Sequence, residues 1–179
     1  MGLTKKQFQQ PPRTALEVFE MLPEGTLAEV INNVIYMSPA PSFPHQDLCT
    51  QLASLIRVHT SSEGIGKCIA SPIDVYFDGS NVFQPDIIFI SNENMGIVKD
   101  EKVKGAPDLI IEILSPGNKK HDTERKKPVY EKNGVKEFFV IDPRSKEVIT
   151  FYLKSKKFEK QESISGKISS VLLKKSFAF

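Results

Sequence analysis

The sequence predicts an α/β or α+β fold, in which helices cover a mixed central β-sheet and an N-terminal β-hairpin precedes it. Hydrophobic residues at helical spacing occur near the N-terminus and in the centre of the chain. Alternating or continuous aliphatic runs, which are typical of strands, occur between and after these segments. At 179 residues, with 40% hydrophobic and 26% charged residues, the chain matches one globular domain, which we expect to span residues 1–179.

The first predicted elements are a short helix and the hairpin. Thr14, followed three residues later by Glu17, is the capping-box pattern of a helix start. The β-prone runs 27–31 and 34–38 are joined by two asparagines, which tolerate the left-handed conformation of a tight turn. We therefore expect a hairpin that carries Glu29.

A longer helix and two strands follow. Residues 45–59 predict a surface helix with one buried stripe. The stripe consists of Leu48, Leu52, Leu55 and Ile56. Segments 73–77 and 82–90 predict two antiparallel strands. Because Pro85 interrupts the second segment, we expect an edge, a bulge or a bend where Asp86 occurs.

The second half of the chain begins with its most aliphatic strand. Residues 109–114 are nearly all branched aliphatic, which predicts a central strand that is covered on both faces. A helix at 121–132, ended by Gly134, and a strand at 136–141 complete a strand–helix–strand unit. Short terminal strands are expected at 148–153, 158–162 and 169–173.

Charge and composition exclude several classes of function. The chain has 24 lysines and arginines against 22 acidic residues, and a net charge of +2 excludes nucleic-acid binding through bulk charge alone. No apolar run approaches the ~20 residues of a membrane helix, so we expect a cytoplasmic protein with no membrane partner. Cys49 and Cys68 have neither CxxC spacing nor clustered histidines, and we interpret them as core residues.

Glu112 breaks the aliphatic pattern of the central strand. In an extended strand, Ile110, Glu112 and Leu114 share one face, so the carboxylate projects between aliphatic neighbours. An unpaired buried carboxylate is strongly unfavourable, and a cation is therefore expected beside it. A functional metal ion and the partner in a structural salt bridge both satisfy this requirement, and periodicity does not choose between them.

Asp86 supplies a second acid at the start of an apolar run. Two strands that each carry one acid can pair the carboxylates of Asp86 and Glu112 across the sheet. Carboxylate oxygens suit Mg²⁺ or Mn²⁺, which leave room for a phosphate group. Glu29 is a candidate third acid. In the alternative interpretation, Asp86 only caps a turn after Pro85.

The helix that follows the central strand supplies candidate cations. Asp122, Lys126 and Tyr130 recur at intervals of four and share a helical stripe. Lys126 can face the acids and stabilise charge on a phosphoryl oxygen, or it can pair with Asp122 on a solvated face. Two basic clusters are candidate contacts for a nucleic-acid backbone. They consist of Lys119, Lys120, Arg125, Lys126 and Lys127, and of Lys154, Lys156 and Lys157.

Taken in order, these segments resemble the PD-(D/E)XK nuclease superfamily, and in particular the Uma-two family of proposed restriction endonucleases, which occurs mainly in bacteria. The resemblance covers most of the chain. It includes segments 28–31 and 37–41, His45-Gln46, segments 84–86 and 107–116, Asp122, Lys126, Tyr130, and segments 134–139 and 140–143. The order and spacing of the pieces are more specific than any single piece.

The resemblance implies a restriction-endonuclease-like mixed sheet in which Asp86 and Glu112 bind a divalent metal, Mg²⁺ or Mn²⁺. It also implies that Glu29 assists this site and that Lys126 is the basic catalytic residue. The roles of Asp122 and of the histidine at position 45 stay open at this stage.

The chain departs from the superfamily pattern at the lysine. The usual position, two residues after the second acid, is occupied here by Leu114. The basic group is therefore expected from the next helix, as in the relocated lysine that the resemblance implies. Because Pro128 lacks a backbone donor and follows closely, Lys127 is an alternative to Lys126.

Three functional interpretations follow. The first is an endonuclease that uses Asp86, Glu112 and a helix lysine, with Mg²⁺ or Mn²⁺, to hydrolyse phosphodiester bonds in DNA. The second is a nuclease-fold protein that binds nucleic acid or another protein without cutting it. The third is a structural domain with a salt-bridged Glu112. Restriction-type nucleases often pair two sites to cut two strands, and by this analogy a homodimer is expected.

Overall fold

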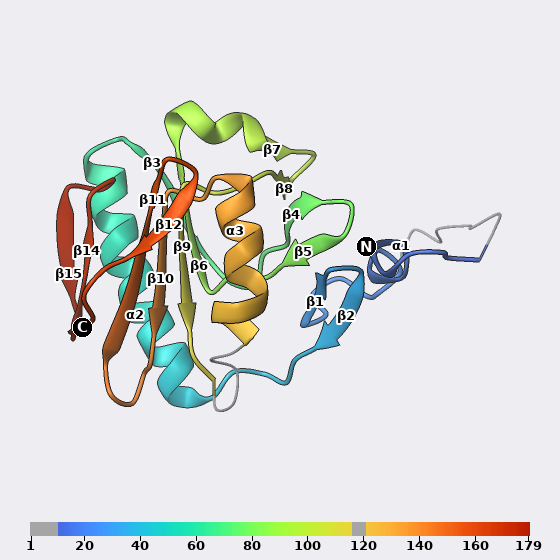
Figure 1. Cartoon of the computed structure of the whole chain (residues 1–179), viewed down its shortest axis with the longest axis horizontal. Coiled ribbons are helices and arrows are strands. Elements are labelled where there is room, and N and C mark those ends of the chain that lie inside the picture. The colour runs from blue at the N-terminus through green and yellow to red at the C-terminus, as the bar shows by residue number, and fades with distance from the viewer. Residues whose placement is uncertain (1–10, 116–120) are drawn as a thin grey trace.

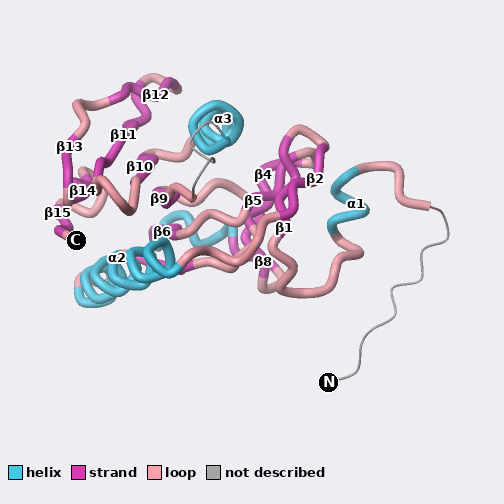
Figure 2. Tube along the Cα trace, turned by 90° about the horizontal axis from the view of Figure 1, so that it is seen from below, coloured by secondary structure: helices cyan, strands magenta, loops and turns pink. Residues whose placement is uncertain are grey.

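The computed structural model describes residues 11–115 and 121–179, except for the side chains of His121 and Asp122. A seven-stranded sheet forms the body of the molecule (Figure 1). The helices α2 (Phe43–Ser62) and α3 (Lys127–Asn133) lie on opposite faces of this sheet (Figure 2). An arm projects from the body and carries α1 (Ala15–Phe19) (Figure 1).

The centre of the large sheet is the predicted strand–helix–strand unit. β9 (Leu109–Ile113) runs parallel to β10 (Glu137–Ile141), and α3 lies between them in the chain. The strand order is β12 (Lys157–Lys160), β11 (Glu147–Lys154), β10, β9, β6 (Ile87–Ser91) and β3 (Gly66–Ala70), with β13 (Ile164–Ser165) paired to β11. β9 therefore has a strand on each side, as its aliphatic composition predicts.

The predicted hairpin belongs to a second, six-stranded sheet. Its order is β2 (Val34–Met37), β1 (Ala28–Ile31), β5 (Asn81–Phe83), β4 (Val75–Asp78), β8 (Lys102–Lys104) and β7 (Val98–Lys99). Two further elements are the 3-10 helix η1 (Asn92–Ile97) and a separate hairpin, β14 (Lys167–Ser170) and β15 (Lys175–Ala178). The mixed α+β fold class is confirmed, but the described strands form three sheets and not one.

Pro85 lies where the chain passes from one sheet to the other. The single strand predicted at 82–90 is wrong, because this segment forms β5 in the six-stranded sheet and β6 in the seven-stranded sheet. Proline cannot donate to a strand ladder, so the ladder stops there. As a result, Asp86 lies at the boundary between the two sheets, directly before β6.

Local sequence signals account for several element ends. The Thr14 hydroxyl accepts the Glu17 N–H at 3.1 Å at the start of α1. Asn32 and Asn33 take the positive φ values of 50° and 61° that the β1–β2 turn requires. Gly134 ends α3 with a φ of 85°. These predictions are confirmed.

Other boundaries differ from the sequence prediction. α2 begins two residues before position 45, because Pro44 is compatible with the first turn of a helix. Leu55 is 40% exposed, whereas Cys49 is buried in the core on that side of the sheet. The strand predicted at 169–173 ends at Ser170, and residues 171–174 form the turn to β15.

Side chains alternate across β9 and separate two cores. Leu109, Ile111 and Ile113 face the α2 side, and Ile110 and Leu114 face the α3 side. Both cysteines are free and lie in the core on the α2 side, where burial raises the pKa of each thiol to about 12. None of the helices in the described ranges combines the length and apolar character needed to cross a membrane.

Gly66 provides a test of the pairing between β3 and β6. Its φ is +155°, and a Cβ atom there would overlap the Ile90 carbonyl oxygen and lie 2.8 Å from Phe89 Cε2. We expect Gly66→Ala to lower the free energy of unfolding by about 2–4 kcal/mol, measured by urea denaturation. Gly79→Ala is the control, because no atom lies within 4 Å of the corresponding Cβ. Equal stability of the two variants would contradict the described approach of these strands.

Candidate active site

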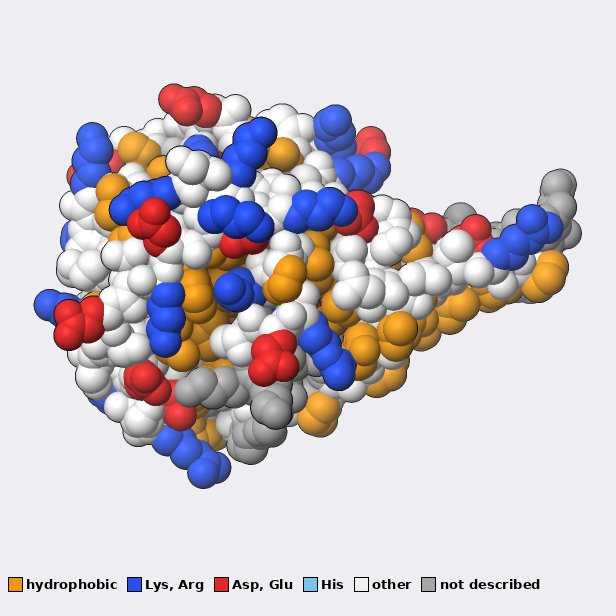
Figure 3. Space-filling model, in the orientation of Figure 1, with side chains coloured by type: hydrophobic (Ala, Val, Ile, Leu, Met, Phe, Trp, Pro, Cys, Tyr) orange, Lys and Arg blue, Asp and Glu red, His pale blue; other side chains and the backbone are white. Residues whose placement is uncertain are grey.

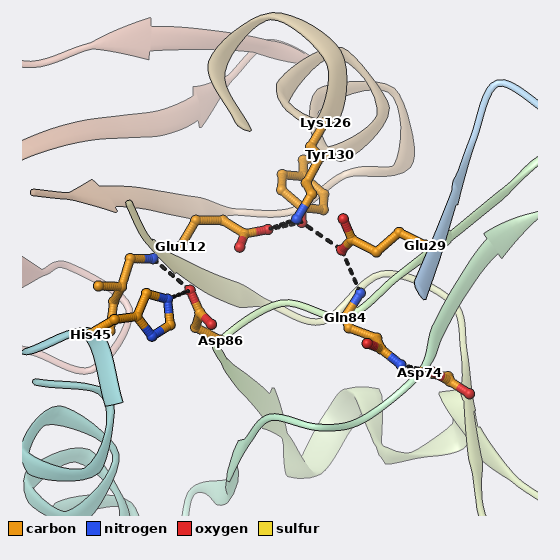
Figure 4. Close-up of polar contacts among 9 residues, drawn as sticks. Glu29, His45, Asp74, Gln84, Asp86, Glu112, Lys126 and Tyr130 are labelled. Atoms are coloured by element: carbon orange, nitrogen blue, oxygen red, sulfur yellow. Dashed lines mark hydrogen bonds and ion pairs between the residues drawn. The ribbon is translucent and has the colours of Figure 1, made fainter. Parts of the chain in front are cut away.

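The candidate site lies where β1, the 84–86 loop, the end of β9 and the turn before α3 meet (Figure 4). At its centre, Lys126 Nζ lies 2.8 Å from Glu29 Oε1 and 3.1 Å from Glu112 Oε1. Lys126, Glu29 and Glu112 are 4%, 7% and 3% exposed. Three of the four predicted catalytic residues therefore form one buried ion cluster.

The turn before α3 determines which lysine reaches the acids. Residues 121–126 form a π-helical turn that leads directly into α3. Pro128 lies in the first turn of α3, where the missing N–H has little effect. Lys126 points toward the sheet, whereas Lys127 Nζ lies 4.9 Å from the centre of the Phe151 ring. Of the two lysines that the sequence left open, Lys126 is the one that contacts the acids.

Tyr130 holds the Glu112 carboxylate from the α3 side of the sheet. Its hydroxyl donates a 2.5 Å hydrogen bond to Glu112 Oε1, the same oxygen that contacts Lys126. Three rings lie 5.0–5.5 Å from the buried Tyr130 ring: Phe77, Phe83 and Phe138. This packing restricts the Tyr130 side chain and so fixes the position of its hydroxyl.

Glu29 reaches the cluster from the other sheet. The backbone N–H of Gln84 donates to Glu29 Oε1 at 2.7 Å. The Gln84 side-chain amide donates in turn to Asp74 Oδ1 at 2.8 Å and to the Thr26 carbonyl at 3.0 Å. Gln84 therefore ties the β1 hairpin to the loop that carries Asp86. The sequence pattern predicted no separate role for Gln84, because its contacts with Glu29 and Thr26 join segments that are distant along the chain.

Asp86 lies next to the ion cluster and not inside it. In the β6–β9 ladder Ile87 pairs with Ile111, so the same register places Asp86 opposite Glu112. Asp86 Oδ2 accepts the N–H of Ile113, the residue after Glu112, at 2.7 Å. The register thus makes Asp86 and Glu112 neighbours, and the predicted pairing of their carboxylates at a metal ion stays a prediction.

His45 contacts Asp86 from the face of the sheet that α2 covers, opposite the face that α3 covers. It lies in the first turn of α2, is 5% exposed, and its Nε2 lies 3.2 Å from Asp86 Oδ2. The sequence left the role of this histidine open. Its position at the helix start, three residues after the N-cap residue Ser42, brings it to the start of β6.

The predicted alternatives can now be compared with the geometry. Glu112 does form a salt bridge with a lysine, but that lysine is Lys126, the residue that the resemblance selects as catalytic. The alternative of Lys126 on a solvated face is wrong, because its side chain is buried against the sheet. The Asp122 side chain lies outside the described residues.

In the parts of the chain that are described, no three His, Cys, Asp or Glu side chains are close enough to form a complete protein ligand set for a metal ion. Glu112 lies in β9, and Asp86 lies directly before β6, where it accepts the N–H of Ile113. Mg²⁺ often uses only one or two protein carboxylates and completes its coordination with water and substrate. Two carboxylates are the number of protein ligands that Mg²⁺ or Mn²⁺ needs when water and phosphate complete its coordination.

The sheet and the acids beside a helix lysine define a restriction-endonuclease-like protein. The fold is similar to that of a solved protein from Anabaena variabilis ATCC 29413, titled "a putative nuclease belonging to DUF820". The TM-score is 0.69 and the identity 22%, over 83% of this chain and 84% of that chain. The chain belongs to the Uma2 (Uma-two) family, described as "Putative restriction endonuclease", whose profile matches residues 10–174. No curated protein matches the sequence.

The departure at the superfamily's lysine position has a geometric explanation. Leu114 lies on the same face of the sheet as Glu112 and is buried in the α3-side core. Lys126 approaches that face from the helix, and its Nζ lies 3.1 Å from the Glu112 carboxylate. A helix lysine thus supplies the cation on the face where the usual strand position carries a leucine.

Removing the buried ammonium tests the cluster as a unit. Lys126→Met removes the ammonium that contacts both buried carboxylates, and we expect it to lower the free energy of unfolding by about 3–5 kcal/mol. The triple variant Glu29→Gln, Glu112→Gln, Lys126→Met carries no charge there and is expected to recover most of this loss. Both values come from urea denaturation.

Lys132→Met is the matched control for Lys126→Met. The Lys132 side chain is 77% exposed and its Nζ lies 3.8 Å from Asp78 Oδ2, so less than about 1 kcal/mol should be lost. If Lys126→Met were no more destabilising than Lys132→Met, the described buried cluster would be wrong.

Proposed function

We propose that this chain is a metal-dependent DNA endonuclease that hydrolyses phosphodiester bonds. The observation that carries the proposal is the buried contact of Lys126 with Glu112, next to Asp86, which accepts the N–H of Ile113. A lysine and two acids, placed by neighbouring strands and one helix, are the groups that phosphodiester hydrolysis uses. Family membership supports a nuclease. The residues named here are those that we propose carry out the hydrolysis.

The charge of the site favours a divalent cation. Glu29, Glu112 and Asp86 carry three formal negative charges, and Lys126 carries one positive charge. Among the described residues, these acids outnumber the lysine at the boundary of the two sheets, where Asp86 lies beside His45. We assign Asp86 and Glu112 as the residues that hold Mg²⁺ or Mn²⁺. When bound, such an ion polarises the phosphate and lowers the pKa of a coordinated water.

Each remaining residue has a distinct task in this proposal. The Lys126 ammonium stabilises negative charge that develops on the phosphate oxygens. Glu29 orients that ammonium through the 2.8 Å contact, and the Gln84 N–H holds Glu29 in turn. Tyr130 and His45 position the two metal-holding carboxylates of Glu112 and Asp86.

The nuclease proposal predicts cleavage that depends on both acids. Wild-type protein should nick supercoiled plasmid DNA in Mg²⁺ or Mn²⁺, whereas Asp86→Asn and Glu112→Gln should each lower the rate at least about 100-fold, since both acids hold the ion. Glu162→Gln, which changes an exposed acid in the segment between β12 and β13, should cut like the wild type. Equal nicking by the wild type and all three variants would refute the assignment.

A second candidate function is a nuclease-fold protein that binds nucleic acid or protein without cutting it. Its specific support is that Lys126 already contacts both Glu29 and Glu112, and that all three side chains are buried. Titration calorimetry with Mn²⁺ separates the candidates. An endonuclease should take up Mn²⁺ with a heat that Asp86→Asn and Glu112→Gln abolish, whereas a non-cutting binder should show no heat that depends on these acids.

A further inference from the structure

Two parallel contacts join the β1–β2 hairpin to the turn before α3. Glu29 and Tyr36 are direct cross-strand partners in the hairpin, and Arg125 and Lys126 are consecutive in the turn. Lys126 makes the inner contact, at 2.8 Å from Glu29. Arg125 makes the outer contact, with its Cζ 5.1 Å from the centre of the Tyr36 ring. The inner pair is buried and the Arg125 side chain is exposed.

The outer contact leaves the charge of Arg125 available. Arginine stacked on an aromatic face keeps its N–H donors in the plane of the guanidinium, where they can bind a phosphate in a bidentate manner. Among the described residues, Arg125 contacts the Tyr36 ring and not a carboxylate. The ring therefore orients the cation without neutralising it.

The lysine on the other side of Lys126 has a similar environment. Lys127 Nζ lies over the Phe151 ring, at 4.9 Å from its centre. By contrast, Lys157 pairs with Glu131 at 2.9 Å, and Lys132 Nζ lies 3.8 Å from Asp78. Figure 3 shows lysine and arginine side chains gathered on the face of the molecule that carries α3. Arg125 and Lys127, on either side of Lys126 in the chain, both rest on aromatic rings.

We propose that Arg125, oriented by Tyr36, binds a backbone phosphate of duplex DNA next to the phosphate at Lys126. This inference rests on the proposed nuclease function and names the contact that positions the substrate. Because Arg125 and Lys126 are consecutive residues on one turn, they lie close enough to contact neighbouring phosphates of a single DNA strand. Because the contact reads phosphate and not a base, its contribution is the same for every DNA sequence.

The test measures binding of a labelled DNA duplex by fluorescence anisotropy at several salt concentrations, in the Glu112→Gln background so that the duplex stays intact. Arg125→Ala is expected to weaken binding about ten-fold and to reduce the slope of log K against log salt by about 0.9. Lys175→Ala is the matched control. It also removes one cation from an aromatic ring, that of Phe177 in the C-terminal hairpin, and should leave both affinity and slope unchanged.

Substitution of Tyr36 separates orientation from charge. Tyr36→Phe keeps the ring and should bind like the parent, whereas Tyr36→Leu should weaken binding while the salt slope falls by less than in Arg125→Ala. Arg125→Lys keeps the positive charge but loses the planar guanidinium that binds phosphate in a bidentate manner. Its affinity should lie between those of the parent and Arg125→Ala. Melting temperatures equal to the parent's show that each variant is folded.

The outcomes for this inference and for the nuclease proposal differ. Unchanged affinity and slope in Arg125→Ala would overturn the phosphate contact, even if the wild type nicks plasmid DNA. Loss of binding in Arg125→Ala, combined with no nicking by the wild type, would support the contact and overturn the nuclease. Absence of any duplex binding by the parent would overturn the phosphate contact as well.

Discussion

The structure depends on one buried ammonium group held between two buried carboxylates. Glu29 belongs to the six-stranded sheet, Glu112 to the seven-stranded sheet and Lys126 to the turn before α3. Removing any of these charges from water is costly unless its partners are present with good geometry. The cluster therefore forms only when both sheets and the helix are correctly placed, and it links the assembly of the fold to the assembly of the candidate site.

The surrounding contacts hold each charged side chain of the site in position. The Tyr130 hydroxyl, whose ring is packed among other aromatic rings, holds the Glu112 carboxylate. The backbone N–H of Gln84 holds the Glu29 carboxylate. Asp86 is held separately, by the Ile113 amide and His45, at the point where the chain changes sheets. This separation leaves one acid beside the lysine cluster and not neutralised by it. The proposed nuclease function requires such an arrangement, because its site would accept both a divalent cation and the negative charge of a phosphate.

Much of the fold could be predicted because its signals are local. Helix caps, the paired asparagines, the aliphatic strand at 109–114 and Gly134 each act within a few residues of where they occur. The division of strands among three sheets could not be predicted in this way, since each strand's alternation is compatible with several partners. Pro85 signalled a break in the ladder, but only the complete sheets show that the break separates two of them.

The sequence by itself determined that Glu112 is buried and needs a cation, because period-two alternation fixes the face of a strand residue. It also placed Asp86 and Lys126 on the elements next to it. Only the tertiary structure decided that the cation is Lys126 and not Lys127, that Glu29 shares it, and that His45 contacts Asp86. These contacts join residues far apart in the chain, so they follow from how sheets and helices pack and not from local pattern.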